Sequence, residues 1–351
     1  MQVRRAVRHA ISALHGGEIS PLVLVGLSGG ADSLALAAGL AAEASTAGIR
    51  AGAIVVDHGL QPGSSDIAAS AADQARTLGL DPVVVRRVAV REGGGPEAAA
   101  REARYAAFAA VAMELSPVAI MTAHTRDDQA EQVLLALARG SGTRSIAGIP
   151  PVRHLSETCV LVRPFLGADP AIVRATTVAA CAELGLAAWN DPHNADPGYA
   201  RVRVRERVLP VLTDELGVGI RAGLARSADL AREDAEALDT WAARAVRELG
   251  EITADGAGTT GAIVIGSAGI ARLAELPAAV RQRVLHRIAA ESFGVNLSRE
   301  HTLALALLVT DWRGRGPAFV PGIRATRLRH ELRLVGQVGS PRGVDAASSE
   351  S

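Results

Sequence analysis

The stretch LVLVGLSGGADSLALAAGL, residues 22–40, decides how the first half of this chain folds. An aliphatic run typical of a buried strand ends in a turn, and an Ala- and Leu-rich run typical of a helix follows. Glycines let backbone amides approach an anion closely, and the positive end of the following helix faces the same point. The corner therefore predicts a phosphate-binding turn made of Ser28-Gly29-Gly30-Ala31-Asp32-Ser33.

Asp32 is the unusual member of this turn. A carboxylate beside phosphates is repulsive unless a divalent cation lies between them, so we expect Mg²⁺ between Asp32 and a bound nucleotide. The turn has neither the GxxxxGK[ST] nor the GxGxxG pattern. A tight turn before a capped helix explains this corner alone equally well.

Alternating strand and helix patterns follow the turn. The strands are expected at 51–57, 82–90, 117–123 and 159–165, and helices near 32–45, 65–79, from Pro96 onward, at 127–140 and at 170–185. Near-continuous apolar strands separated by helices are typical of a parallel sheet that is covered on both faces. The fold class is therefore α/β, with an N-terminal nucleotide-binding domain.

The second half predicts a smaller, mainly helical domain. A long helix over 219–248 leads into it, LSREH at 297–301 is typical of a capped helix start, and residues 316–335 have the pattern of a β-hairpin. We divide the chain into residues 1–215, residues 216–336 and a disordered tail over 337–351.

Composition narrows the class of protein. The 351 residues are enough for two domains, and the formal net charge of zero argues against a strongly basic protein that coats nucleic acid. The chain has no signal-peptide pattern and no apolar segment long enough to span a bilayer. We therefore expect a soluble, cytoplasmic protein with no membrane association, and no protein partner is evident.

Polar residues also follow other expected strands. His124 comes after the strand at 117–123, and Asp128 and Glu131 lie three residues apart on one helix face. Since the carboxyl ends of parallel strands share one edge, these side chains are expected beside the phosphate-binding turn. An acidic first helix turn and a half-buried histidine are the simpler interpretations. Arg104 either points into this cleft or is an ordinary surface arginine.

Several motifs together resemble a known family. The turn SGGADS is similar to the loop of the N-type ATP pyrophosphatases, which belong to the PP-loop superfamily. The series DHGLQPGSSD, EAAAREARYAAF, TAHTRDDQAEQVLLALARGSG and YARVRVRERVLP is more specific and resembles the tRNA(Ile)-lysidine synthetases. The resemblance is dense over about residues 20–215 and thinner at LSREH and at DWRGRGPAFVPG (311–322).

This resemblance implies a ligase that acts on an isoleucine tRNA with a CAU anticodon. ATP would adenylate the 2-carbonyl of the wobble cytidine with release of pyrophosphate. The ε-amine of free L-lysine would then displace AMP to give lysidine, which changes decoding from AUG to AUA. ATP, Mg²⁺, lysine and this tRNA are the implied ligands.

The resemblance also implies roles for residues. Ser28 through Ser33 would bind ATP, with Asp32 on the metal, and Arg104 would contact a phosphate or the activated base. Asp128 and Glu131 would bind the lysine ammonium group or take its proton, and His124 is a second candidate base. The family often has two adjacent histidines where this chain has His124-Thr125, and commonly Arg-Asn where it has Arg201-Val202.

Arginines suggest where tRNA binds. Arg201 and Arg205 form an i,i+4 pair, and strand alternation places Arg327, Arg329 and Arg333 on one face with Leu328, Leu332 and Leu334 on the other. We expect tRNA contacts at Arg201, Arg205, Arg327 and Arg329. A solvated strand face is an equally good interpretation of the last two.

Other functions are weighed against this one. A tRNA thiolase on the same loop needs cysteines that carry sulfur or a cluster, but Cys159 and Cys181 are far apart and form no CxxC motif. An amidating ligase usually carries an ammonia-producing domain, and nothing in the sequence resembles one. A non-catalytic nucleotide-binding module would not need Asp128 and Glu131 at the same edge.

Overall fold

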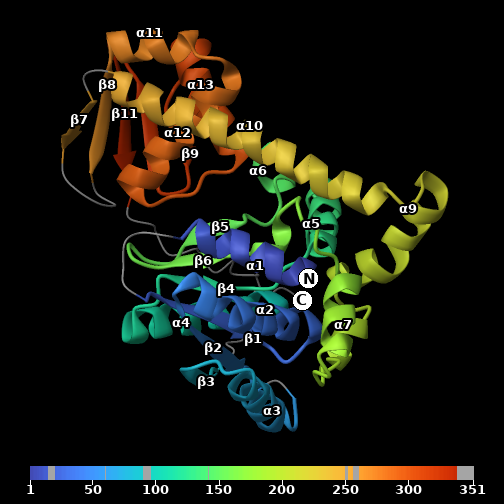
Figure 1. Ribbon diagram of the computed structural model, residues 1–351. Coiled ribbons are helices and arrows are strands. Elements are labelled where there is room, and N and C mark those ends of the chain that lie inside the picture. Colours follow the sequence, from blue (N-terminus) through green and yellow to red (C-terminus); the bar gives the residue numbers. More distant parts are fainter. Residues whose placement is uncertain are drawn as a thin grey trace, which may run out of the picture. The chain divides into compact units, whose positions relative to one another are not determined.

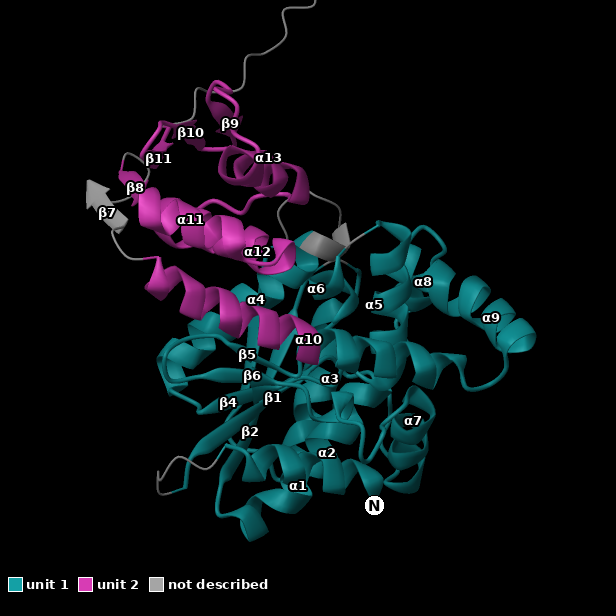
Figure 2. Cartoon of the chain, turned by 90° about the horizontal axis from the view of Figure 1, so that it is seen from above, with its two compact units in different colours: residues 1–232 teal, residues 233–351 magenta. Residues whose placement is uncertain are grey.

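The computed structural model describes residues 1–14, 20–59, 61–89, 96–140, 142–249, 252–255 and 261–337. The chain divides into two compact units, residues 1–232 and residues 233–351 (Figure 2). This division falls within α10 (Ile220–Glu248), the long helix expected over 219–248. The tail predicted over 337–351 lies outside the described residues from residue 338 onward.

The first unit contains a six-stranded sheet in the order β3-β2-β1-β4-β6-β5 (Figure 1). All its neighbouring strands are parallel except β5, which pairs antiparallel with β6. The predicted parallel sheet is confirmed, and β5 is an edge strand that the sequence pattern did not indicate. The strands are β1 (Leu22–Leu27), β2 (Arg50–Asp57), β3 (Val83–Arg87), β4 (Ala119–Met121), β5 (Val152–His154) and β6 (Val160–Val162).

Helices cover both faces of this sheet, as predicted. Val23 and Val25 of β1 pack into a core with α1 (Gln2–Ser12), α2 (Ala31–Ala47), α3 (Ser64–Thr77) and α7 (Arg174–Glu183). Leu24, on the opposite face of the same strand, packs with Phe108 and Val111 of α4 (Pro96–Leu115). Side chains that alternate along β1 therefore pack into two hydrophobic cores, one on each face of the sheet.

Connections at the carboxyl edge of the sheet carry the polar residues. β1 leads through the SGGADS turn into α2, and β4 leads through His124 into α5 (Arg126–Ala138). After α7 the chain passes through η2 (Pro192–Ala195), α8 (Ala200–Arg203), the π-helix η3 (Val204–Val208) and α9 (Leu209–Leu216). The shorter elements α6 (Thr143–Ile146) and η1 (Pro164–Leu166) complete the unit. Among the described residues, no helix has the length and apolarity needed to cross a bilayer.

The second unit pairs helices with an antiparallel sheet in the order β7-β8-β11-β10-β9. The β10–β11 hairpin is confirmed, whereas β7 and β8 extend the sheet beyond the hairpin that the sequence indicated. The elements are β7 (Ile252–Asp255), β8 (Ala262–Gly266), α11 (Ser267–Glu275), α12 (Ala278–Phe293), α13 (Arg299–Thr310), β9 (Ala318–Val320), β10 (Ile323–Arg327) and β11 (Glu331–Gly336).

The hairpin register corrects the predicted arginine face. Arg327 pairs with Leu332, and cross-strand partners share a face, so Arg327 lies on the core side and Arg333 on the opposite side. Leu328 lies just before the turn and is half exposed. The prediction was wrong because it assumed that all odd-numbered residues of the hairpin lie on one face. A two-residue turn pairs each odd-numbered residue of one strand with an even-numbered residue of the other, so the two strands place opposite parities on the same face.

Candidate active site

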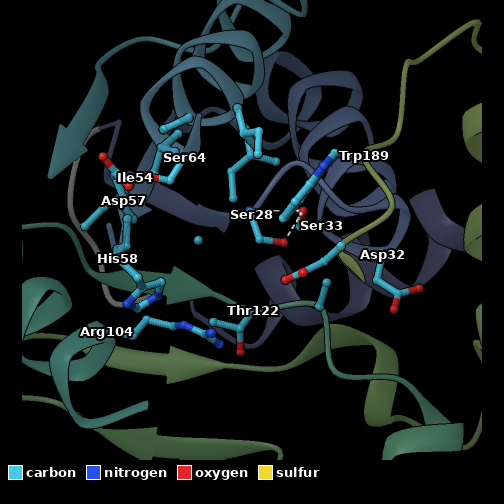
Figure 3. A pocket seen from close by; sticks show the side chains of 18 of the residues that line it. Ser28, Asp32, Ser33, Ile54, Asp57, His58, Ser64, Arg104, Thr122 and Trp189 are labelled. Atoms are coloured by element: carbon cyan, nitrogen blue, oxygen red, sulfur yellow. Dashed lines mark hydrogen bonds between the residues drawn. The ribbon is translucent and has the colours of Figure 1, made fainter. Parts of the chain in front are cut away.

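A cavity of about 330 Å³ lies at the carboxyl ends of β1, β2 and β4. Ser28 and Ser33 line one side of it, and His58 and Arg104 line the other (Figure 3). The cavity therefore lies where open α/β sheets bind their ligands. Its lining includes six of the predicted site residues: Ser28, Asp32, Ser33, Arg104, His124 and Asp128.

The SGGADS turn is held in shape by its own hydroxyls. The backbone amide of Ser28 donates to Oγ of Ser33 over 3.1 Å, and the Ser33 hydroxyl donates to the carbonyl of Gly30 over 2.9 Å. Gly29 has a φ of +83°, which a residue with a Cβ rarely adopts. Helix α2 starts directly after Gly30, so its N-terminal amides face the cavity edge. This arrangement suits a phosphate group.

Asp32 lies in the first turn of α2 and is held from α7. The hydroxyl of Thr177 donates a hydrogen bond to the Asp32 carboxylate, and Nε of Arg174 lies 3.9 Å from Oδ2. Burial raises the pKa of Asp32, against the lowering effect of the Thr177 hydrogen bond. A bound cation would favour the ionised form of this carboxylate.

The donor set fits Mg²⁺ bound together with a nucleotide. Within the described ranges, no group of three or more His, Cys, Asp or Glu side chains is placed to hold a metal ion. Mg²⁺ usually takes only one or two carboxylates and completes its shell with phosphate and water. The single carboxylate of Asp32 beside a phosphate-binding turn matches that habit.

The acid pair of α5 divides between two environments. Glu131 is fully buried, and Arg205 reaches it through Nε at 2.7 Å and Nη2 at 3.1 Å. Arg201 adds a contact at 3.2 Å and Arg174 one at 3.5 Å. Arg201 and Arg205, which were expected to contact tRNA, therefore form ion pairs with Glu131.

Asp128 instead faces the cavity. Its Oδ2 accepts from the amide of Thr125 over 2.7 Å, and its Oδ1 lies 3.3 Å from Nη2 of Arg174. Burial opposes its ionisation, yet the cations of Arg174 and Arg201 and the hydrogen bond from the Thr125 amide lower its pKa. Asp128 is therefore a carboxylate at neutral pH.

His58 and His124, two of the histidines that line the cavity, are neutral bases. Burial lowers the pKa of His124 to about 3, although Asp128 acts in the opposite direction. Burial together with Arg104 lowers the pKa of His58 to about 4. A neutral imidazole has one nitrogen that accepts a proton. Nδ1 of His124 lies 3.2 Å from the hydroxyl oxygen of Thr122.

The structure also shows residues that sequence reasoning missed. The Arg174 guanidinium lies within 4 Å of the carboxylates of Asp32, Asp128 and Glu131, at 3.9, 3.3 and 3.5 Å. It therefore links the proposed metal ligand to the acid pair of α5. The backbone amide of Trp189 donates to the carbonyl of Gly29 over 2.9 Å, and the Trp189 side chain lines the cavity. Arg174 is the first residue of α7 and Trp189 lies in the segment after it, so neither is at the end of a strand, and no motif of the sequence marked them.

Arg327 and Arg329 belong to the second unit. The guanidinium of Arg327 lies 5.5 Å from the ring centre of Trp312, while Arg329 is exposed at the turn of the hairpin. Every described residue that lines the cavity belongs to the first unit.

Comparisons with known proteins show the family of this chain. A family model described as the PP-loop domain matches residues 3–212. The tRNA(Ile)-lysidine synthase of Leifsonia xyli subsp. xyli is 54% identical over 306 residues, with 87% of each chain covered. That of Salinispora arenicola is 50% identical over 339 residues, with 95% of each chain covered.

A solved structure shares the fold. The U34-tRNA thiolase NcsA of Methanococcus maripaludis, with its [4Fe-4S] cluster, aligns with a TM-score of 0.52 and 18% identity. The alignment covers 66% of this chain and 78% of the thiolase, and at this identity it shows the architecture alone. The family model and the relatives together show that the chain belongs to the PP-loop family and, within it, to the tRNA(Ile)-lysidine synthases.

Proposed function

We propose that this chain joins lysine to the 2-carbon of the wobble cytidine in an isoleucine tRNA with a CAU anticodon, at the expense of ATP. The observation that carries the proposal is one cavity lined by Ser28, Asp32 and Ser33 of the SGGADS turn together with His124 and Asp128. The similarity to lysidine synthases over most of both chains supports this choice of substrates. A tRNA substrate also favours a cytoplasmic location.

The first step activates the cytidine. The SGGADS turn would hold the phosphates through its amides and hydroxyls, and the cation of Arg104 would offset charge on the phosphates or the activated base. Asp32 would hold Mg²⁺, which supplies charge neutralisation on the pyrophosphate when bound. Thr177 and Arg174 would keep the Asp32 carboxylate in position.

The second step needs a neutral amine. Asp128 is ionised and faces the cavity, so it would bind the ε-ammonium group of lysine. Neutral His124 would accept one proton from this ammonium group, which leaves an amine that can attack the activated carbon. AMP then leaves, and the Asp128 carboxylate would accept the second proton from the nitrogen that has been joined to the base. Fully buried Glu131 would position the arginines around Asp128.

Of the four arginines that were expected to contact tRNA, the two in the second unit remain candidates. Ion pairing to Glu131 favours a positioning role for Arg201 and Arg205 over contact with the RNA backbone. Exposed Arg329 is free to meet a phosphate, and Arg327 would support it from the same hairpin.

The thiolase alternative is not favoured. Cys159 and Cys181 are both buried, and burial raises the pKa of Cys159 to about 11 and raises that of Cys181 as well. Two protonated thiols on separate elements cannot serve as a sulfur carrier pair. A module that only binds a nucleotide is also not favoured, because it would not need His124 and Asp128 in the cavity.

The test is transfer of labelled lysine to tRNA. The full chain is incubated with ATP, Mg²⁺ and an isoleucine tRNA transcript with a CAU anticodon, and a methionine tRNA with the same anticodon is the control. Label in the first transcript alone, with one AMP and one pyrophosphate formed per lysine, is the expected result. A folded chain that binds ATP but labels neither transcript would contradict the proposal.

A further inference from the structure

Three arginines surround one tyrosine beside the cavity. Cζ of Arg101 and Cζ of Arg153 lie 5.2 and 5.0 Å from the ring centre of Tyr105. The Tyr105 hydroxyl oxygen accepts from Nη2 of Arg101 over 3.2 Å and from Nη2 of Arg163 over 3.0 Å. We call Arg101, Tyr105, Arg153 and Arg163 the tyrosine–arginine cluster. It joins α4, the edge strand β5 and the residue that follows β6.

The charges of this cluster are not balanced within the described part of the chain. No carboxylate there lies within ion-pair distance of Arg101, Arg153 or Arg163. Arg163 is only 2% exposed, and its buried Nε has no hydrogen-bond partner among the described residues. Burial lowers the pKa of Arg163, and so does repulsion from Arg101 and Arg153. A buried cation without a counter-charge is costly, so an anion from outside would complete the site.

The position of the cluster indicates which class of anion could bind there. Arg104, the residue before Tyr105, lines the cavity, whereas no member of the cluster does. Arg101 and Arg153 are exposed, whereas Arg163 is buried and also donates from Nη1 to the carbonyl of Pro150. The site is thus open to solvent next to the cavity edge. An enzyme that acts on one base takes that base into its pocket, while the nucleic-acid backbone stays at the surface. An open, positively charged site next to the cavity is suited to such a backbone.

We propose that the tyrosine–arginine cluster binds a phosphodiester group of the RNA next to the cytidine that enters the cavity. This inference rests on the proposed function for the identity of the RNA. Guanidinium groups pair with the two non-bridging phosphate oxygens in a fork, and the aromatic ring restricts their orientation. The α-carboxylate of free lysine is the competing anion, and the experiment separates the two.

The test uses Arg101→Gln and Arg153→Gln, which remove one exposed charge each and leave no buried acid unpaired. We expect the Kd for the tRNA transcript to rise about tenfold at moderate salt. The slope of log Kd against log salt should become shallower by about 0.7 to 0.9 for each phosphate that the variant no longer binds. The KM values for lysine and ATP should stay unchanged.

Two further variants serve as controls. Arg153→Lys keeps the positive charge and should retain most of the salt slope. Arg50→Gln removes an exposed arginine at the first residue of β2, at the opposite edge of the sheet from the cavity, and should bind tRNA like the unmodified chain. Circular dichroism and thermal unfolding check that each variant is folded.

The outcomes are distinct. An unchanged tRNA Kd and salt slope in both glutamine variants would overturn the inference, and a raised KM for lysine alone would assign the site to the lysine carboxylate instead. Transfer of lysine by the unmodified chain is scored separately. If that transfer fails while the variants still weaken tRNA binding, the proposed function fails and the RNA site stands. Absence of any tRNA binding by the unmodified chain would overturn both.

Discussion

Thr177 is a buried hydroxyl on α7 that acts on a carboxylate of α2. Its hydrogen bond lowers the pKa of Asp32, while burial raises it. The side chain therefore helps to keep the proposed metal ligand ionised. The hydroxyl also lies 2.8 Å from the carbonyl oxygen of Arg174. Since valine has the same shape without the hydroxyl, a substitution at this residue tests the hydroxyl group alone.

For Thr177→Val we expect a fall of about tenfold in the rate of pyrophosphate release and a decrease of about 1 kcal/mol in the free energy of unfolding. The reason is that the Asp32 carboxylate no longer has its donor. Single-turnover assays and urea unfolding measure the two effects, with exposed Thr77→Val as the matched control. A rate equal to that of the unmodified chain would refute the positioning role.

The two neutral histidines predict how stability depends on pH. In the unfolded chain both return to a pKa of about 6.5, whereas in the folded chain they lie near 4 for His58 and 3 for His124. Below about pH 6.5 the unfolded state therefore binds more protons. The free energy of unfolding should fall as pH drops from about 6.5 to 4, by up to about 1.4 kcal/mol per pH unit for each histidine.

Urea unfolding across this pH range measures the effect, and His58→Gln should remove one of the two contributions. A variant with the same pH dependence as the unmodified chain would show that His58 is not kept neutral by folding.

At the scale of elements, α5 presents its two acids to different partners. Glu131 is fully enclosed and binds arginines from α8 and from the π-helix η3, while Asp128 faces the cavity. One residue thus fastens elements together, and the other is available to a ligand. Removal of a buried partner leaves the arginines uncompensated, which usually costs about 3–5 kcal/mol.

We therefore expect Glu131→Gln to reduce stability by several kcal/mol together with activity. Asp128→Asn should reduce lysine transfer by about a hundredfold or more, with stability changed by about 1 kcal/mol or less, because the asparagine oxygen can still accept from Thr125. Thermal unfolding and lysine transfer are measured on both variants. Equal decreases in stability in the two would show that Asp128 is structural as well.

At the scale of the whole molecule, the chain has two compact units, and the proposed chemistry belongs to the first. The second unit would then contribute through RNA binding. Arg329 is its exposed candidate, since Arg327 lies against Trp312 on the core side of the hairpin.

Arg329→Glu should raise the Kd for tRNA by about three- to tenfold and make its salt dependence shallower, because the variant neutralises one phosphate fewer. The KM for ATP should not change. Filter binding at several salt concentrations measures this, with Arg272→Glu on α11 as an exposed control in the same unit. Unaltered tRNA affinity in the Arg329 variant would argue against a role for the hairpin.

Local features of the sequence were sufficient for much of this architecture. The run at 22–40 determined a strand, a tight turn and a helix, because apolar periodicity and glycine geometry act between near neighbours. The same rules predicted the parallel sheet and the positions of Asp32, His124 and Asp128 at its carboxyl edge, whereas the family followed from the resemblance of several motifs to known enzymes. The short edge strand β5 escaped prediction because three residues carry too little periodicity.

Only the tertiary structure decided which charges meet. Packing of α7 beside α2 and α5 brings Arg174 and Thr177 to carboxylates far away in sequence, and the π-helix η3 directs Arg205 onto Glu131. Likewise, the two-residue turn between β10 and β11 set the register that places Arg327 on the core side. Such contacts depend on how whole elements pack, and no local pattern in the sequence records that arrangement.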